Sequence, residues 1–305
     1  MPTWDGEFRV DALGKFASHD SLLKILTSGS LLWSRPDRFN DPFDCQPRFR
    51  LPDFSVEAEE KILNEFQRFV ADQISSVSIN NRMGKATSSL AHAIQAGKLS
   101  LNEVWAELRE EVQAMLSPNS DFCEKFHQQV VLTLQTVKVL CLTKAFDEIL
   151  MWSHYATNHT GALIVFSPRS NDSIFSITKP VEYRDTLPLI FEIDEVAKLF
   201  TGQSSMTDES SIKDSFFQII LTKAISWKYE REWRIVAGDG FRPNDSIEFN
   251  KFHLDDVEAV VFGARYPAAM IDLLVANAKN LYPKTNWYRA TLSEVRFGLD
   301  MMRVT

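Results

Sequence analysis

Glycine is scarce in this 305-residue sequence, at 11 residues, and neither GxGxxG nor GxxxxGK[ST] occurs in it. Because such loops cradle phosphates with backbone N–H groups, their absence argues against a Rossmann or P-loop nucleotide site. Cysteine is also rare, and Cys45, Cys123 and Cys141 form an odd, widely spaced set. This spacing fits neither a disulfide framework nor a metal-binding pair. We therefore expect reduced thiols in a cytoplasmic protein.

Long apolar runs are missing as well, and none approaches the roughly 20 residues of a membrane span. The first residues include Asp5 and Glu7 without an apolar segment, so no signal peptide is expected. The net charge of −8 excludes a general electrostatic attraction to nucleic acid. With 45% hydrophobic and 24% charged residues the composition is that of a globular protein. We expect no contact with a membrane.

The order of apolar patterns predicts an α+β fold with a mixed, largely antiparallel sheet. Residues 55–136 repeat apolar side chains at helical spacing and predict an insertion of three or four helices. Around this insertion, strands and helices alternate irregularly, which favours α+β over a regular doubly wound fold. We therefore predict a discontinuous α+β domain of residues 1–54 and 137–305, with 55–136 as a helical insertion.

Individual elements follow from the same patterns. Ser18 is expected to cap a helix that ends before Gly29. The remaining helices are expected at 147–159, 187–200, 211–226 and 267–281. Strands are expected at 8–16, 31–33, 137–142, 162–166, 177–183, 233–237, 246–249, 257–262 and 287–297.

The richest polar motif is the run WKYEREWR at 227–234, which leads into the apolar residues 235–237. If this run starts a strand, alternation places Glu230, Glu232 and Arg234 on one face. One carboxylate could act as a base or stabilise a cationic transition state. The alternative is an ion-pair ladder of marginal stability. Glu232 lies deeper toward the apolar strand and is the better catalytic candidate.

A second motif joins Trp152, Ser153, His154 and Tyr155, followed by His159 and Gly161. His154 could form a hydrogen bond with a ligand or orient a carboxylate. It could equally satisfy a backbone carbonyl at the rim of the core.

The third motif is the NDPFD run at 40–44, preceded by Arg35 and Arg38. Asn and Asp often close turns through side-chain-to-backbone hydrogen bonds, so this loop has a structural explanation. Loops held by a rigid scaffold also bind ligands, and the two arginines could bind a phosphate or remain at the surface.

These three motifs, in this order, resemble the hallmarks of a widespread bacterial family known only as a domain of unknown function, DUF2971. The resemblance spans most of the chain, with 55–136 as a less characteristic insertion. The family label carries no chemistry.

A second resemblance is to the split-sheet fold of the ADP-ribosyltransferases. Lys15 and Phe16 in an opening strand, a helix at 18–27, Ser34 and finally Glu232 occur in matching order. Two departures are that Lys15 stands where that fold usually has His or Arg, and that its aromatic/serine motif is not clear here. The resemblance implies that Glu232 binds the nicotinamide ribose of NAD and stabilises an oxocarbenium-like transition state.

The resemblance thereby implies NAD as substrate, without a metal, in an ADP-ribosyltransferase or NAD glycohydrolase that acts as a toxin or antiphage effector. The implied catalytic residues are Glu232, Glu230 and His154, and the implied NAD-binding residues are Lys15, Phe16, Ser34, Arg35, Asn40, Asp41, Tyr155 and Arg234.

Two other functions remain open from the sequence. One is a non-catalytic sensor that binds a nucleotide or other ligand and docks a partner on residues 55–136. The other is a phosphodiester hydrolase in which Glu230, Glu232 and Asp44 bind a divalent cation.

Overall fold

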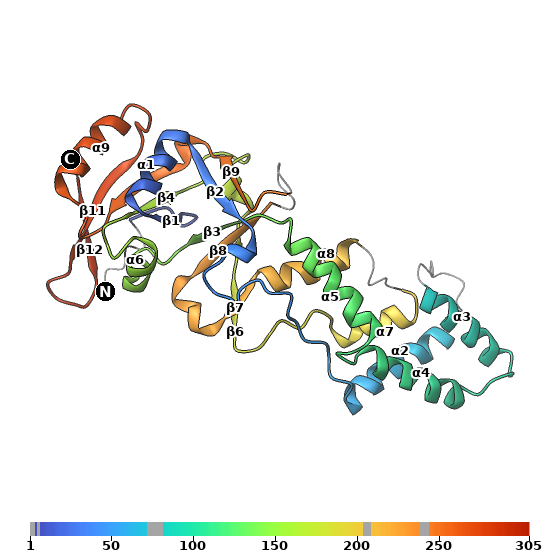
Figure 1. Ribbon diagram of the computed structural model, residues 1–305. Coiled ribbons are helices and arrows are strands. Elements are labelled where there is room, and N and C mark those ends of the chain that lie inside the picture. Colours follow the sequence, from blue (N-terminus) through green and yellow to red (C-terminus); the bar gives the residue numbers. More distant parts are fainter. Residues whose placement is uncertain (1–3, 5–6, 72–81, 204–208, 238–243, 305) are drawn as a thin grey trace. The chain divides into compact units, whose positions relative to one another are not determined.

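The computed structural model describes residues 4, 7–71, 82–203, 209–237 and 244–304 (Figure 1). The chain divides into two compact units. The sheet unit consists of residues 1–44, 135–183 and 223–305, and the helical unit consists of residues 45–134 and 184–222. Residues 45–54 and 184–222, which the sequence analysis assigned to the α+β domain, thus group with the helices.

A large sheet forms the sheet unit, in the order β12-β11-β10-β4-β1-β3-β2-β9, with β8 paired to β3 and β5. Within it, β10 and β11 are parallel and the other pairs are antiparallel. This confirms the α+β prediction and its mixed, mostly antiparallel sheet. The strands are β1 Leu13–Ala17, β2 Ser30–Ser34, β3 Val139–Thr143, β4 Ala162–Phe166, β5 Lys179–Pro180, β8 Glu232–Val236, β9 Ile247–Lys251, β10 Val257–Phe262, β11 Asn286–Leu292 and β12 Leu299–Arg303. Two short strands, β6 Glu182–Arg184 and β7 Thr222–Ala224, form a separate pair.

The register of the central strands positions the candidate site. β3 and β8 pair over five residues, so that Glu232 lies opposite Thr143. Thr143 in turn lies opposite Gly14, where β3 meets β1. Lys15 follows Gly14, and these antiparallel pairings therefore bring Lys15 and Glu232 to the same part of the sheet.

Three helices cover the faces of this sheet. α1 (His19–Ser28) begins at Ser18, whose hydroxyl accepts a hydrogen bond from the backbone N–H of Ser21. It ends at Gly29, whose φ of 61° is the left-handed conformation that glycine adopts at little cost. The other two helices are α6 (Ile149–Tyr155) and α9 (Ala268–Ala278). The described residues also form 3₁₀ turns, namely η1 Pro36–Arg38, η2 Ile174–Ile177, η3 Ile225–Glu230 and η4 Leu254–Asp256.

Alternation along the buried strands separates two apolar clusters. In β4, Ile164 and Phe166 belong to the cluster that includes side chains of α1 and α9. Leu163 and Val165 point the other way, into the cluster that includes Trp152 of α6. Every residue of β4 and β10 is buried, which explains their continuous apolar sequences.

The helical unit contains the amphipathic helices that the 55–136 pattern predicts. Buried Ile62, Phe66 and Phe69 lie on one side of α2, and a capping box of Ser100 and Glu103 begins α4. α2 packs against α7 within this unit, which explains why the segment around α7 joins it. The helices are α2 Val56–Ala71, α3 Arg82–Gln95, α4 Leu101–Met115, α5 Asp121–Leu134, α7 Ile193–Phe200 and α8 Glu209–Ile220.

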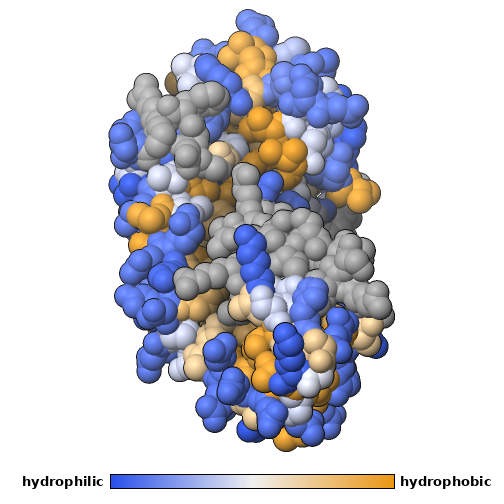
Figure 2. All heavy atoms as spheres, turned by 90° about the vertical axis from the view of Figure 1, so that its right-hand side faces the viewer, coloured by the Kyte–Doolittle hydropathy of each residue, from blue (hydrophilic) through white to orange (hydrophobic). Residues whose placement is uncertain are grey.

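The visible surface in Figure 2 is mostly hydrophilic, with apolar side chains scattered between the polar ones. Among the described residues, no helix is both long enough and apolar enough to cross a membrane.

Several sequence predictions need correction. The strand expected at 8–16 is the shorter β1, the strand expected at 177–183 is divided between β5 and β6, and the helix expected at 211–226 is α8, which ends at Ile220. The run 227–234 is not a strand from its start, because η3 occupies 225–230 and β8 begins only at Glu232. The helix expected at 147–159 stops at Tyr155, because Thr157 to His159 have positive φ angles that end the helical conformation. The strand expected at 287–297 ends at Leu292, and the chain returns as β12, an element that the apolar pattern did not reveal.

Candidate functional site

A pocket of about 110 Å³ opens in the sheet unit where the polar motifs meet. Lys15 and Phe16 come from β1, Asn40 and Asp44 from the loop after η1, and Tyr155 from the end of α6. The rest of the lining consists of Gly14, Phe39, Met151, residues 141–143 of β3, Lys223, Glu230 and Glu232. Sites for drug-sized ligands usually measure about 300–1,000 Å³, so this pocket encloses one small group at a time.

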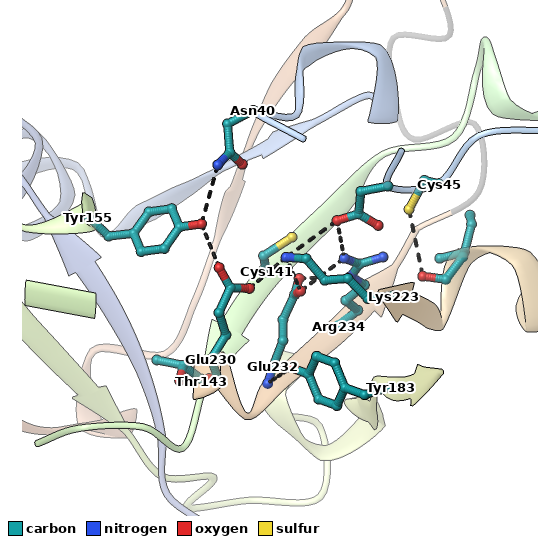
Figure 3. A network of polar contacts seen from close by, with 12 residues as sticks. Asn40, Cys45, Cys141, Thr143, Tyr155, Tyr183, Lys223, Glu230, Glu232 and Arg234 are labelled. Atoms are coloured by element: carbon teal, nitrogen blue, oxygen red, sulfur yellow. Dashed lines mark hydrogen bonds and ion pairs between the residues drawn. The ribbon is translucent and has the colours of Figure 1, made fainter. Parts of the chain in front are cut away.

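A buried ionic cluster lies beside the pocket (Figure 3). Arg234 donates through Nε to Oε1 of Glu232 at 2.7 Å and through Nη2 to Oε2 at 2.9 Å. The same Nη2 donates to Oδ2 of Asp44 at 2.6 Å. Arg234 is 1% exposed, and Phe39 covers its guanidinium at 5.5 Å. The two hydrogen bonds from the Arg234 guanidinium hold the Glu232 carboxylate in one orientation.

Lys223 is the second cation of the cluster. Its Nζ lies 2.5 Å from Oε2 of Glu230, 3.0 Å from Oε2 of Glu232 and 3.5 Å from Oδ2 of Asp44. Burial alone would lower the pKa of Lys223, but the three carboxylates raise it well above its ordinary value. The ammonium group therefore stays charged.

Burial also acts on the carboxyl group of Glu232. It would raise the pKa of Glu232, but Arg234 and Lys223 overcome this effect and lower the pKa to about 2. Three carboxylates and two cations leave the buried cluster with a charge of −1 if all five groups are ionised. A buried cluster of this kind is weak evidence for stability and has to be explained by specificity or by use.

Glu230 differs from Glu232 in how many further hydrogen bonds its carboxylate oxygens can accept. Both oxygens of Glu232 already bind the guanidinium, and one also binds Lys223. Oε1 of Glu230 accepts one hydrogen bond from the hydroxyl of Tyr155 at 2.6 Å, and Oε2 accepts one from Lys223. A carboxylate oxygen has room for two such bonds, so Glu230 has more acceptor capacity for a ligand.

Tyr155 links Glu230 to the NDPFD loop. The amide of Asn40 donates to the Tyr155 hydroxyl at 3.5 Å, and burial together with Glu230 raises the pKa of Tyr155 well above its ordinary value. The hydroxyl stays protonated at neutral pH and can donate continuously to Glu230.

Local backbone geometry explains why Glu230 and Glu232 converge although a strand does not join them. η3 ends at Glu230, and Arg231 takes a left-handed conformation with φ 43° that turns the chain into β8. The hydroxyl of Thr143 donates to the backbone carbonyl of Glu230, and the hydroxyl of Tyr183 accepts from the backbone N–H of Glu232 at 2.7 Å. These contacts fix both ends of the turn. The prediction that Glu230, Glu232 and Arg234 lie on one side therefore holds in space, for a reason other than strand alternation.

Lys15 and Phe16 line the pocket from β1. Nζ of Lys15 donates to the backbone carbonyl of Cys141 at 2.8 Å, and among the described residues it forms no salt bridge. Phe16 is 7% exposed and packs edge-on against Trp152, so it belongs mainly to the core while one side faces the pocket.

Five residues that were predicted for the site do not line the pocket, and one of them, Arg234, lies in the ionic cluster beside it. Ser34 ends β2, and Arg35 binds Asp37 at 2.6 Å. Asp41 closes a turn by accepting from the backbone N–H of Phe43 at 2.9 Å. His154 is exposed, and its ring contacts that of Tyr155 edge-on.

Lys223 and Cys141 are site residues that the sequence analysis missed. Lys223 follows α8 without any motif around it, and Cys141 is one residue of an apolar strand. The sequence contained an indirect signal for Lys223. Burial of Glu230, Glu232 and Asp44 in one place requires more than one buried cation to pair with them.

The cluster also bears on a possible metal site. Lys223 occupies the space among the three carboxylates, so a divalent cation would have to displace an ammonium group that forms three close contacts. Within the described parts of the chain, no group of three His, Cys, Asp or Glu side chains has an arrangement suited to a metal ion.

Comparison with known proteins gives one result. No curated protein and no solved structure matches the chain. A family model described as "Protein of unknown function (DUF2971)" matches residues 151–235, which include Tyr155, Lys223 and the whole WKYEREWR motif. This stretch confirms the family that the motifs predict: residues 151–235 carry the signature of DUF2971.

Proposed function

We propose that the sheet unit cleaves the glycosidic bond between nicotinamide and ribose in NAD, as a glycohydrolase or an ADP-ribosyltransferase. The observation that carries the proposal is Glu230, a buried carboxylate at the pocket with remaining acceptor capacity, held by Tyr155 and Lys223. The apolar walls of Phe16, Phe39 and Met151 suit a flat ring beside this carboxylate.

The charges of the pocket suit the nicotinamide half of NAD. The ring of oxidised NAD is cationic, and the buried cluster carries a charge of −1 when its five groups are ionised. The phosphate next to the ribose is anionic, and Lys15 supplies a cation on the pocket lining. Only the nicotinamide end fits a space of about 110 Å³, so the adenine end of the dinucleotide would lie outside it.

In the proposed step the C1′–N bond breaks, and its electron pair leaves with nicotinamide, which becomes neutral. The ribose C1′ becomes an oxocarbenium-like cation, which Glu230 stabilises by charge and by accepting a hydrogen bond from a ribose hydroxyl. Water, or a nucleophile on an acceptor, forms the new bond to C1′ and releases its proton to solvent. The products are nicotinamide and ADP-ribose, free or attached to the acceptor.

This proposal changes the roles of the two glutamates. Glu230 becomes the residue that contacts the substrate, and Glu232 becomes the residue that holds Arg234 and Lys223 in place. The preference for Glu232 in the sequence analysis came from its depth in the strand, and that depth is what ties it to the guanidinium.

The test is incubation of the purified protein with NAD and measurement of free nicotinamide by chromatography. Glu230→Gln should fold normally and lose at least about 100-fold in rate, as expected for a group that stabilises transition-state charge. Glu258→Gln is the matched control, because Glu258 is also a buried glutamate of the sheet unit but binds Ser167 and the backbone of Arg9 instead. Wild-type rates in Glu230→Gln would refute the assignment.

The other functions give different results in the same experiment. NAD binding by calorimetry without nicotinamide release, with or without cell lysate as a source of acceptors, would favour the sensor. Hydrolysis of a phosphodiester that requires Mg²⁺ or Mn²⁺ would favour the metal-dependent hydrolase. The proposal includes a cytoplasmic location, which the free thiols support, and a role as a toxin or antiphage effector remains a prediction.

A further inference from the structure

The chain passes between the sheet unit and the helical unit at four places. On the side of the sheet unit, the residues at these passages are Asp44, Gln135, Tyr183 and Lys223. Three of these four residues belong to the polar network around the pocket, although they are far apart in sequence.

Each of the three contacts a different part of the network. Asp44 binds Arg234 at 2.6 Å, and Lys223 binds Glu230 at 2.5 Å and Glu232 at 3.0 Å. The Tyr183 hydroxyl accepts from the backbone N–H of Glu232 at 2.7 Å (Figure 3). All three contacts lie inside the sheet unit, and in each case a residue directly adjacent along the chain (Cys45, Arg184 or Thr222) belongs to the helical unit.

Within the helical unit, the segments that continue from these residues are joined to one another. The thiol of Cys45, which follows Asp44, donates to the backbone carbonyl of Ile220. Arg50 pairs with the 184–192 segment through backbone bonds to Pro188 and Ile190. Ser215 of α8 donates to the carbonyl of Ile190 at 3.2 Å. These contacts join the three segments to one another within the helical unit.

We infer that the helical unit regulates the pocket through Asp44, Tyr183 and Lys223. A change in the helical unit shifts these side chains together, because each is covalently continuous with a segment of that unit. Withdrawal of Lys223 would leave Glu230 and Glu232 without their shared cation and would change both the charge and the acceptor capacity of the pocket. This inference gives the regulation of the proposed activity, but the coupling itself can be measured without turnover.

The first experiment uses hydrogen exchange, measured by mass spectrometry on the full chain. Ser215→Ala removes a hydrogen bond that lies wholly inside the helical unit. If the units are coupled, exchange in residues 222–236, including the Glu232 amide, should rise about five-fold, as expected for a lost hydrogen bond of ordinary strength. Thr201→Ala is the control, because the Thr201 hydroxyl donates to carbonyls of α7 and accepts from the side chain of Gln203, away from the four passages.

The second experiment runs in the opposite direction. Tyr183→Phe removes only the hydroxyl that holds the Glu232 amide, and exchange in 184–200 and 45–54 should rise by a similar factor. Tyr282→Phe is the matched control, because Tyr282 is a buried tyrosine of the sheet unit whose hydroxyl binds the carbonyl of Leu26, away from the passages.

The results separate this inference from the proposed function. Exchange changes that stay within the mutated unit in both variants would overturn the coupling, even if the protein releases nicotinamide. Absence of nicotinamide release would overturn the proposed function, even if the changes cross between the units. If the units are coupled and the protein releases nicotinamide, Ser215→Ala should also alter the rate of nicotinamide release, while Thr201→Ala should not.

Discussion

Removal of the guanidinium of Arg234 tests the physical account of the buried cluster. In Arg234→Met, Glu232 and Asp44 lose the cation that binds both of them and share only Lys223. Arg234 and Lys223 lower the pKa of Glu232 from 4.5 to about 2. This difference corresponds to about 3 kcal/mol of folding free energy at neutral pH. Loss of one partner from a buried ion pair costs about 3–5 kcal/mol, and because Lys223 remains beside Glu232 we expect a loss at the lower end, about 3 kcal/mol.

The sign of the pH dependence follows from the lowered pKa. A carboxyl group with a lower pKa in the folded state stabilises the protein above its unfolded pKa. This stabilisation is lost as the pH falls from about 4.5 toward 2. The difference between wild type and Arg234→Met should therefore be largest at pH 7 and should shrink to roughly half by pH 3.

The assay is urea unfolding followed by tryptophan fluorescence between pH 3 and pH 7. Six of the seven tryptophans lie in the sheet unit, so this signal reports mainly on the unit that contains the cluster. Arg9→Met is the control, because Arg9 forms an exposed pair with Asp11 and its loss should matter little. A loss below about 1 kcal/mol in Arg234→Met at pH 7, or a difference that does not change with pH, would refute the reasoning.

Three further changes test other parts of the structure. Tyr155→Phe should fold normally and reduce the rate of nicotinamide release about ten-fold, because Glu230 loses a positioning hydrogen bond of 2.6 Å; an unchanged rate would contradict that role. Gly161→Ala should lower the unfolding free energy by more than about 2 kcal/mol in urea titrations, because a Cβ there would lie 2.2 Å from the carbonyl oxygen of Ala17. Ser18→Ala should lower the same free energy by about 1 kcal/mol through loss of the α1 cap, and wild-type stability would show that the cap contributes nothing.

The sequence predicted best where local patterns decide the structure. The strand expected at 257–262 matches β10, and Ser18 and Gly29 bound α1 as predicted. Both strands and caps depend on residues that are close in sequence. The DUF2971 resemblance rested likewise on contiguous motifs, and the family match includes two of the three.

The sequence predicted less well where distant segments decide the structure. Residues 184–222 group with the helical unit because α7 packs against α2, a contact that no local pattern indicates. Lys223 became a site residue through three carboxylates that lie elsewhere in the chain. The turn at Arg231 escaped notice because a non-glycine residue with positive φ leaves no clear trace in a sequence.

The interleaved order of the two units has a consequence for synthesis on the ribosome. Asp44 emerges early, but its partner Arg234 follows 190 residues later. The helical unit needs α7 and α8, and the central strand β1 needs β3 and β4, so neither unit can complete its packing from its first segment. Contacts of such long sequence separation slow folding and leave apolar surface exposed meanwhile. We expect the helical unit to complete its packing only after residue 222 has emerged, and the ionic cluster only after Arg234 has emerged.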